Sequence, residues 1–176
     1  MKQQFILMSD YNQWMNNSFF SHLAKMNDND IYGDKKAFWG SAFNTVSHIF
    51  TCDLLWLNRF KEVESDFNLS EALLHFPNPK SNQEHCFSTL AELHQHRIAL
   101  DAVIIAWVKT ITASELTKPL IYQNTAGKKF SEPFASVLLH FFNHQTHHRG
   151  QVSTLISQSG DNSYCSDLIV RMRELT

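Results

Sequence analysis

Glycine, proline and long apolar runs are scarce in this chain. Five Gly and four Pro among 176 residues are too few for an all-β protein with many tight turns. No segment approaches the roughly 18 consecutive apolar residues of a transmembrane helix, and the run FILM near the N-terminus is shorter than a signal-peptide core. We therefore expect a helical protein of the cytoplasm, with no membrane partner.

Cysteine and net charge are also low. The three cysteines are odd in number and form no CxxC motif, so we expect no disulfide framework. A formal charge of −2 provides no broad basic surface for DNA, and we expect no nucleic-acid partner. The apolar fraction of 43% and charged fraction of 18% are those of a folded globular protein, and the length suits a single domain over residues 1–176.

Apolar residues recur at helical spacing in four long segments. The segments predicted to be helical are 3–26, 38–61, 89–110 and 131–159. Residues 27–36 and 63–83 are polar or rich in turn formers, and we expect connections there, with at most one short turn near SEALLHF. A last short helix is expected within 164–175. Four long amphipathic helices indicate an all-α fold, a four-helix bundle.

Local signals mark the ends of the last two long helices. Thr89 and Glu92 form a T-x-x-E capping box at the start of the third. Ser131 and Pro133 are expected to start the fourth, because Ser can cap a helix and Pro is tolerated in its first turn, and Gly160 is expected to end it. Just before that helix, LIYQ and KKF flank NTAG, which predicts a small β-hairpin.

Histidine is abundant, with ten in the chain, and the stretch NHQTHHRGQ near the C-terminus holds three of them. With His140 at 0° and about 100° per residue, the apolar arc of the last helix covers about 60° to 200°. His148 lies at about 80° and His144 at about 40°, whereas His140 and His147 lie further outside the arc. His144 and His148, one turn apart, are therefore the pair that can point inward. They are either two ligands of one metal ion or two partly buried histidines with hydrogen-bonded rings.

A third ligand would have to come from another helix. His48 lies in the middle of the second predicted helix, beside Cys52 on the helical wheel. His22, His94 and His96 also lie in predicted helices and compete with it. Spacing alone does not choose among these four histidines.

Several motifs together resemble one known family. The sequence resembles the DinB-like family of metal-binding four-helix bundles, in which the last bundle helix carries N-H-x-x-H-H-R-G-Q. The matching segments are NHQTHHRGQ (143–151), DYNQWMN (10–16), SHIFTCDLLWLNR (47–59) and AGKKFSEP (126–133). They cover nearly the whole chain in the family's order.

This resemblance implies a fold and a site. It implies an up-down-down-up order of the helices and one divalent metal ion held by His48, His144 and His148. Zinc and nickel are the expected metals, with iron and manganese as further candidates, since all accept nitrogen ligands. Homodimers are common in the family, so a homodimer is an expectation here too. Catalytic residues other than the metal ligands are not identified.

The resemblance also implies a chemistry. Relatives include thiol S-transferases and a thiol-dependent isomerase, so we expect a metal-dependent thiol S-transferase whose partners are a small-molecule thiol and an electrophile. A metal-dependent hydrolase is the alternative, and a non-enzymatic metal- or metabolite-binding protein is a third interpretation. The sequence shows no clear general base beside the three histidines, which favours thiol transfer over hydrolysis.

Two charged residues lie on apolar helix faces. Asp53 falls in the apolar arc of the second helix and Arg149 in that of the fourth. An unpaired buried charge is costly, so we expect that the two side chains meet or that each bonds a nearby polar group. Arg149 is otherwise a candidate for an anionic substrate or for a structural ion pair.

Three other residue types are also interpreted from their positions in the sequence. Cys52 is a fourth ligand or a small buried hydrophobe. Gly150, in mid-helix, is expected to allow a close approach of another helix. The tryptophans are expected in the core or in a pocket wall; they are Trp14, Trp39, Trp56 and Trp107.

Overall fold

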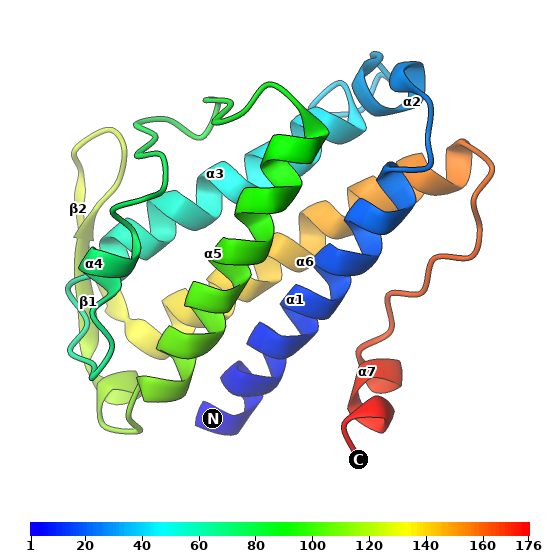
Figure 1. Cartoon of the computed structure of the whole chain (residues 1–176). Coiled ribbons are helices and arrows are strands. Elements are labelled where there is room, and N and C mark those ends of the chain that lie inside the picture. Colours follow the sequence, from blue (N-terminus) through cyan, green and yellow to red (C-terminus); the bar gives the residue numbers. More distant parts are fainter.

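Four long helices pack side by side in the computed structural model, which describes residues 1–176 (Figure 1). They are α1 (Lys2–Leu23), α3 (Ala42–Phe60), α5 (Leu90–Thr110) and α6 (Phe134–Gln158). Helix α6 packs against both α1 and α3, and α1 also packs against α5. The predicted mostly helical fold is therefore confirmed, with all four long helices in their expected places.

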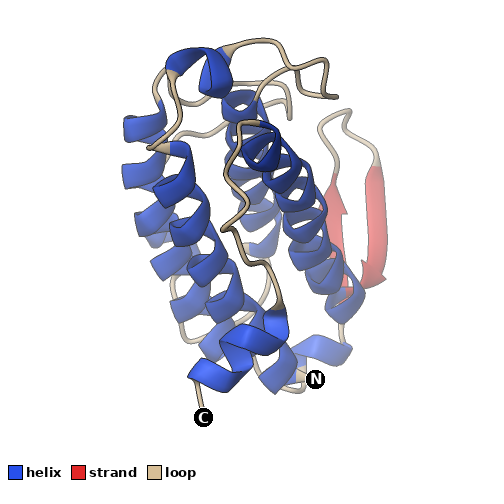
Figure 2. Cartoon of the chain, turned by 90° about the vertical axis from the view of Figure 1, so that its right-hand side faces the viewer, coloured by secondary structure: helices blue, strands red, loops and turns tan.

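The short elements lie in the connections between these helices and after the last of them. They are α2 (Asp28–Tyr32), α4 (Leu69–Ala72), the 3-10 helix η1 (Glu115–Thr117), β1 (Pro119–Gln123), β2 (Lys129–Pro133) and α7 (Leu168–Glu174). Strands β1 and β2 form the predicted hairpin; they are antiparallel, with Pro119 opposite Pro133 and Gln123 opposite Lys129. The hairpin lies beside the helices as a separate two-stranded ribbon (Figure 2).

Capping side chains start two of the long helices. The Thr89 hydroxyl accepts a hydrogen bond from the backbone N–H of Glu92 at 3.2 Å, as the capping box predicted. Ser41 caps α3 by accepting from the N–H of Asn44 at 3.1 Å, so this helix begins later than expected. Residues 27–36 were expected to be only a connection, but Asn27 caps the short helix α2 there.

The expected start of the last long helix at Ser131 is wrong. Ser131 lies in β2, where pairing with β1 keeps the backbone extended, and α6 begins only at Phe134. No side chain caps this helix. Its C-terminus is as predicted, because Gly160 follows the C-cap with φ +101, a left-handed conformation that favours glycine.

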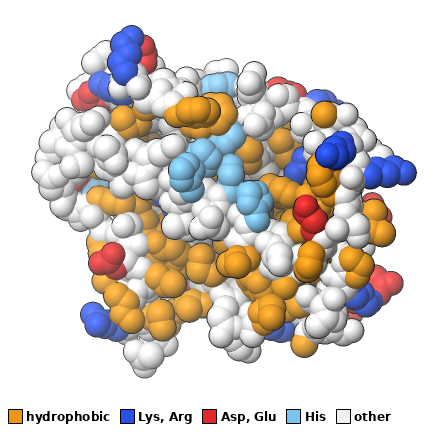
Figure 3. All heavy atoms as spheres, turned by 180° about the vertical axis from the view of Figure 1, so that it is seen from behind, with side chains coloured by type: hydrophobic (Ala, Val, Ile, Leu, Met, Phe, Trp, Pro, Cys, Tyr) orange, Lys and Arg blue, Asp and Glu red, His pale blue; other side chains and the backbone are white.

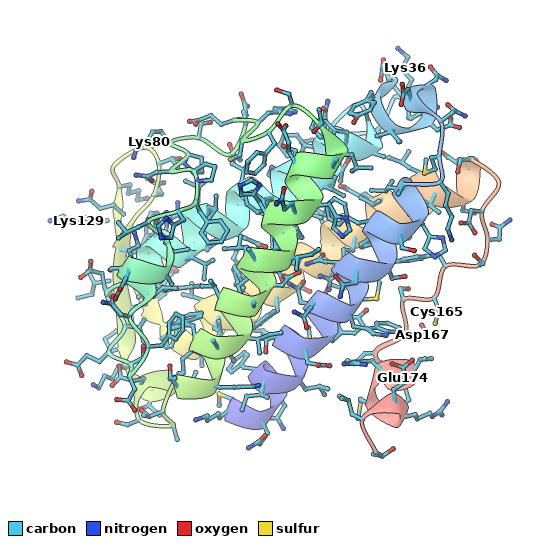
Figure 4. The ribbon with its side chains drawn as sticks, viewed as in Figure 1. Lys36, Lys80, Lys129, Cys165, Asp167 and Glu174 are labelled. Carbon is cyan, nitrogen blue, oxygen red and sulfur yellow. The ribbon has the colours of Figure 1, made fainter.

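The C-terminal segment returns along the outside of the helices. In Figure 4 the labelled Cys165 and Asp167 lie on this segment, before α7. Arg171 of α7 donates two hydrogen bonds to the Asp10 carboxylate of α1, at 2.7 and 2.9 Å, and so fixes the end of the chain to α1. Cys165 is exposed, and all three cysteines are free thiols.

Apolar side chains from all four long helices form one core, with a group of large aromatic rings in it. Phe60 of α3 stacks on Trp107 of α5 with ring centroids 5.1 Å apart, and Phe134 and Phe141 of α6 meet the edge of the same Phe60 ring. Stacked and edge-to-face pairs of this kind add to the free energy gained by burying the rings. Trp107 is thus a core residue, as expected.

A buried polar network crosses this apolar core. Its members are Asn12 and Asn16 of α1, Asp53 of α3, Arg97 and Asp101 of α5, and Gln145 and Arg149 of α6. Asp53 receives hydrogen bonds from Arg97 Nη1 at 2.5 Å and from Gln145 Nε2 at 2.9 Å. Arg97 Nη2 also lies 2.8 Å from Asp101. Asp53 therefore links three of the four long helices.

Asp101 connects the network to the remaining helix. Its carboxylate accepts hydrogen bonds from Asn16 at 3.0 Å and from Asn12 at 3.2 Å. Burial raises the pKa of Asp101 and of Asp53, and the Arg97 guanidinium between the two carboxylates opposes that rise. One arginine thus offsets part of the desolvation of both acids.

The predicted contact between Asp53 and Arg149 does not form. The alternative prediction, that each side chain bonds a nearby polar group, is confirmed. Arg149 donates hydrogen bonds to Asn12 of α1 and to Thr146, and its guanidinium lies over the ring of Tyr11. It forms no ion pair with a carboxylate, and it does not line the pocket that contains His48, His144 and His148. The charge partner of Asp53 is instead Arg97 of α5.

The expected role of Gly150 is also wrong. A Cβ at this position would meet no atom of another element within 4 Å, and the residue is exposed. The structure shows no contact that requires glycine there.

We predict that Asp53→Ala destabilises the protein by about 3–5 kcal/mol, because it leaves the buried guanidinium of Arg97 with one acid fewer and the Gln145 amide without an acceptor. Urea unfolding followed by circular dichroism measures the change. Asp66→Ala is the control, since Asp66 is exposed and makes no ion pair; it should alter the free energy of unfolding by less than about 0.5 kcal/mol. Equal stability of the two variants would contradict the role of the network.

Candidate metal centre

Three histidines from two helices converge at one point. His48 lies on α3, and His144 and His148 lie one turn apart on α6. One ring nitrogen from each lies within 4.8 Å of the others, and the Nε2 atoms of His144 and His148 are 3.1 Å apart. The structure thus brings together the three residues that the sequence and the resemblance selected.

The packing of α3 against α6 creates this convergence. The hydrogen bond from Gln145 to Asp53 joins the two helices. Gln145 directly follows His144, and Asp53 lies five residues after His48, so the bond lies close to the histidines on both helices. The buried polar network therefore fixes the relative position of the two helices beside the cluster.

Hydrogen bonds also orient two of the three rings. Nδ1 of His48 lies 3.0 Å from the backbone oxygen of Asn82, and Nδ1 of His148 lies 2.8 Å from Oε1 of Gln151. Both partners are oxygens that accept, so each Nδ1 donates its proton and each Nε2 carries the lone pair. Metal-binding histidines in proteins typically make this kind of outer hydrogen bond, which fixes the tautomer.

Burial keeps the three imidazoles neutral. It lowers the pKa of His48 to about 4 and that of His144 to about 3, and it lowers the pKa of His148 as well. The nearby imidazoles lower these pKa values further, because two cations would repel each other at this distance. Neutral imidazole is the form that binds a metal ion.

The cluster fits a divalent ion. Metal–nitrogen bonds of about 2.0–2.1 Å in a tetrahedral site separate two ligand nitrogens by about 3.4 Å. The 3.1 Å between the Nε2 atoms of His144 and His148 is close to that separation. Nitrogen donors alone do not choose among zinc, nickel and iron.

A pocket of about 430 Å³ opens beside the histidines. The back view in Figure 3 shows histidine side chains gathered at the surface among apolar ones. The Trp39 ring stacks on the His48 ring with centroids 3.8 Å apart, and Trp56 forms another part of the wall. Both tryptophans are thus pocket walls, as expected, and a ligand in the pocket would reach the histidines directly.

Cys52 lies next to the cluster without joining it. Its Sγ atom is 3.5 Å from Nε2 of His48, but it does not belong to the group of ligand atoms that all lie within 4.8 Å. Burial raises the pKa of this thiol to about 12, which opposes the thiolate form that binds metals. The structure favours the interpretation of Cys52 as a small buried residue of the pocket wall.

The competing histidines make contacts elsewhere. His22 bonds Asp161, His94 stacks on Phe20, and His96 stacks on Phe87. His140 and His147 are exposed and outside the convergent group, as the helical wheel indicated, but both line the mouth of the pocket.

Three residues of the site escaped the sequence analysis. Gln151 lies three residues after His148 on the same helix, a spacing that could have identified it as a hydrogen-bond partner. Asn82 comes from the connection between α3 and α5, and no pattern places that segment against His48. Arg59 lies on α3 three turns after His48, and only the structure shows that it lines the same pocket.

Comparison with known proteins identifies the family of the chain. The chain matches the model of the DinB family over residues 1–174. It belongs to the DinB family. A relative in this family is Protein DinB of Bacillus subtilis (strain 168), which is 27% identical over 158 residues, covering 90% of this chain and 87% of the relative. No solved structure matches the chain. None of its helices has the length and apolar character that crossing a membrane requires.

We predict that His48→Ala, His144→Ala and His148→Ala each lose most of the metal bound by the wild-type protein, because each removes one of three converging nitrogens. Zinc or nickel content after purification without a histidine tag measures this loss. His147→Ala is the matched control, since His147 lies on the same helix outside the group and should retain the metal. Full occupancy in His148→Ala would show that the metal lies elsewhere.

Gln151→Leu should lower metal affinity by about 10- to 100-fold, because the His148 ring would lose the hydrogen bond that fixes its tautomer. Competition with a chelator of known affinity measures this change. The matched control is Gln158→Leu, an exposed position at the end of α6 that contacts no histidine of the cluster. An unchanged affinity in Gln151→Leu would mean that the hydrogen bond does not orient the ligand.

Proposed function

We propose that this DinB-family protein binds a divalent metal through His48, His144 and His148 and acts as a metal-dependent thiol S-transferase on small electrophiles. The observation that carries the proposal is the set of three neutral imidazoles beside an open pocket. Three protein ligands leave a coordination position for another molecule, as in catalytic rather than structural sites. Zinc and nickel are the metals we propose first.

A divalent ion in such a site lowers the pKa of a bound thiol, and so supplies a nucleophile at neutral pH. The chain itself contributes the ligand geometry and the pocket. The thiol sulfur forms a bond to the electrophilic carbon, the thiol proton passes to solvent or to an imidazole at the pocket mouth, and a leaving group departs with its electron pair. His140 and His147 are the imidazoles exposed at that mouth.

The composition of the pocket supports thiol transfer over hydrolysis. No Asp or Glu side chain lines it, so there is no carboxylate to act as a general base toward water. A metal-dependent hydrolase is the alternative function, because His140 and His147 could accept a proton from water in place of a carboxylate. A protein that holds a metal or metabolite without turnover is the third interpretation.

We also propose the up-down-down-up order that the family resemblance implies. The connection between α3 and α5 supports it, because residues 61–89 are long enough to return along the length of the helices (Figure 1). Two consecutive helices of the same direction need a crossover of this kind.

Metal-loaded protein should conjugate a thiol such as glutathione or cysteine with 1-chloro-2,4-dinitrobenzene faster than the uncatalysed rate, and the gain should vanish after chelation. Absorbance of the conjugate measures the reaction. His148→Ala should fall to the uncatalysed rate, whereas His75→Ala, at an exposed histidine that does not line the pocket, should react like wild type.

Other outcomes identify the other two functions. Cleavage of 4-nitrophenyl acetate that depends on metal but not on thiol would replace the transferase with the hydrolase. Tight metal binding without either reaction would favour the binding protein. Retention of helical circular dichroism after chelation is the control for folding, because the apolar core does not include the metal ligands.

A further inference from the structure

Arg59 shares one face of α3 with the histidine cluster. His48, Cys52, Trp56 and Arg59 follow each other at helical spacing, and all four line the pocket of about 430 Å³. The Arg59 guanidinium lies over the Trp56 ring, with Cζ 4.3 Å from the ring centroid, and 5.5 Å from the centroid of Tyr122. The two aromatic rings therefore hold the guanidinium in place at the pocket wall.

This guanidinium has no anionic partner in the protein. It is half-buried, and it takes part in none of the side-chain hydrogen bonds or ion pairs of the structure. The other arginines with buried or half-buried side chains behave differently, since Arg97 and Arg171 pair with carboxylates and Arg149 bonds Asn12. Arg59 is thus a partly desolvated cation whose N–H groups are free.

The charge of the pocket is one-sided. No Asp, Glu or Lys lines this pocket, and Arg59 is its one arginine. The remaining titratable groups in the lining are histidines and Cys52. Arg59 also borders a second cavity, of about 710 Å³, beside the hairpin, which is lined by Glu62, Glu64 and Glu115. Lys118 pairs with Glu64 and Glu115, and Glu62 is exposed and forms no ion pair with Arg59. A divalent ion on the histidines would make the first pocket more positive still.

A stacked guanidinium with free N–H groups suits one kind of ligand. Its face is covered by Trp56, so its donors point outward in the plane of the group, where a carboxylate or phosphate can accept two parallel hydrogen bonds. Such a bond to an ionised group is stronger than one between neutral groups, and the half-buried setting weakens competition from water.

The separation along α3 sets the length of the ligand. Trp56, under the guanidinium, lies eight residues after His48, which corresponds to roughly 12 Å along the helix axis. We propose that Arg59 binds the carboxylate or phosphate group of an extended anionic thiol whose sulfur lies at the three histidines. The placement of the thiol sulfur at the histidines rests on the proposed function, whereas the anion subsite rests on Arg59 alone.

Binding of matched thiols to zinc-loaded protein tests the subsite. The probes are 8-mercaptooctanoate, which is long enough to span the two ends, its neutral counterpart 8-mercaptooctanol, and the short pair 3-mercaptopropionate and 3-mercaptopropanol. Calorimetry gives the affinities without any turnover. The long acid should bind about tenfold or more tightly than the long alcohol, because only the acid forms charged hydrogen bonds with Arg59. For the short pair, which cannot reach Arg59, the acid should have a much smaller advantage.

Variants then assign the preference to one residue. Arg59→Gln should bind the long acid and the long alcohol almost equally, and Arg59→Lys should retain only part of the preference, because lysine keeps the charge but lacks the planar pair of donors. Arg173→Gln, an exposed arginine of α7, is the control and should behave like wild type. Circular dichroism verifies that the variants are folded.

The possible outcomes distinguish a failure of the Arg59 subsite from a failure of the proposed transferase function. Equal binding of the long acid and alcohol by wild type, or a preference that survives in Arg59→Gln, would overturn the subsite and leave the transferase proposal standing. A preference that depends on Arg59 in a protein without conjugating activity would support the subsite and contradict the transferase. Binding of no thiol of either charge would overturn both.

Discussion

The Asp53 carboxylate is the group on which the arrangement of the helices depends. A carboxylate removed from water is tolerated only when charged or polar donors replace its hydration. Here Arg97 of α5 and Gln145 of α6 supply them, at 2.5 and 2.9 Å. Apolar packing alone permits many small rotations and shifts of helices, whereas these bonds form only in one relative position of α3, α5 and α6. The buried polar network therefore adds specificity to an apolar core that supplies most of the stability.

That specificity reaches the candidate metal centre through neighbouring residues. Gln145 lies beside His144 in the chain, so the bond that holds α6 against α3 also fixes where the His144 and His148 rings meet His48. Helices α3 and α6 carry all three histidines, and they also carry Asp53, Gln145 and Arg149 of the network. Charged groups satisfied inside the protein thus hold neutral imidazoles at the edge of a pocket, where a metal and a ligand can reach them.

The two ends of the pocket have different chemistry. At one end, Nε2 atoms carry lone pairs because oxygens of Asn82 and Gln151 hold the protons of His48 and His148 on Nδ1. At the other end, Arg59 offers only donors. Apolar and aromatic walls lie between them, including Trp39 and Trp56. A molecule that reacts at one end and carries an anionic group at the other would match this distribution.

Patterns in the sequence predicted the four long helices, the hairpin and the inward direction of His144 and His148. These features depend on periodicity and local backbone chemistry, which residues close in the chain control. The prediction that Ser131 caps the last long helix was wrong, because pairing between the two strands of the hairpin keeps that residue extended. Three contacts emerge only from the folded protein: Arg97 rather than Arg149 pairs with Asp53, Asn82 orients His48, and Arg59 lines the histidines' pocket. Each of these contacts depends on how one helix is rotated and shifted against another, and the packing of the whole core sets that geometry, which no local pattern encodes.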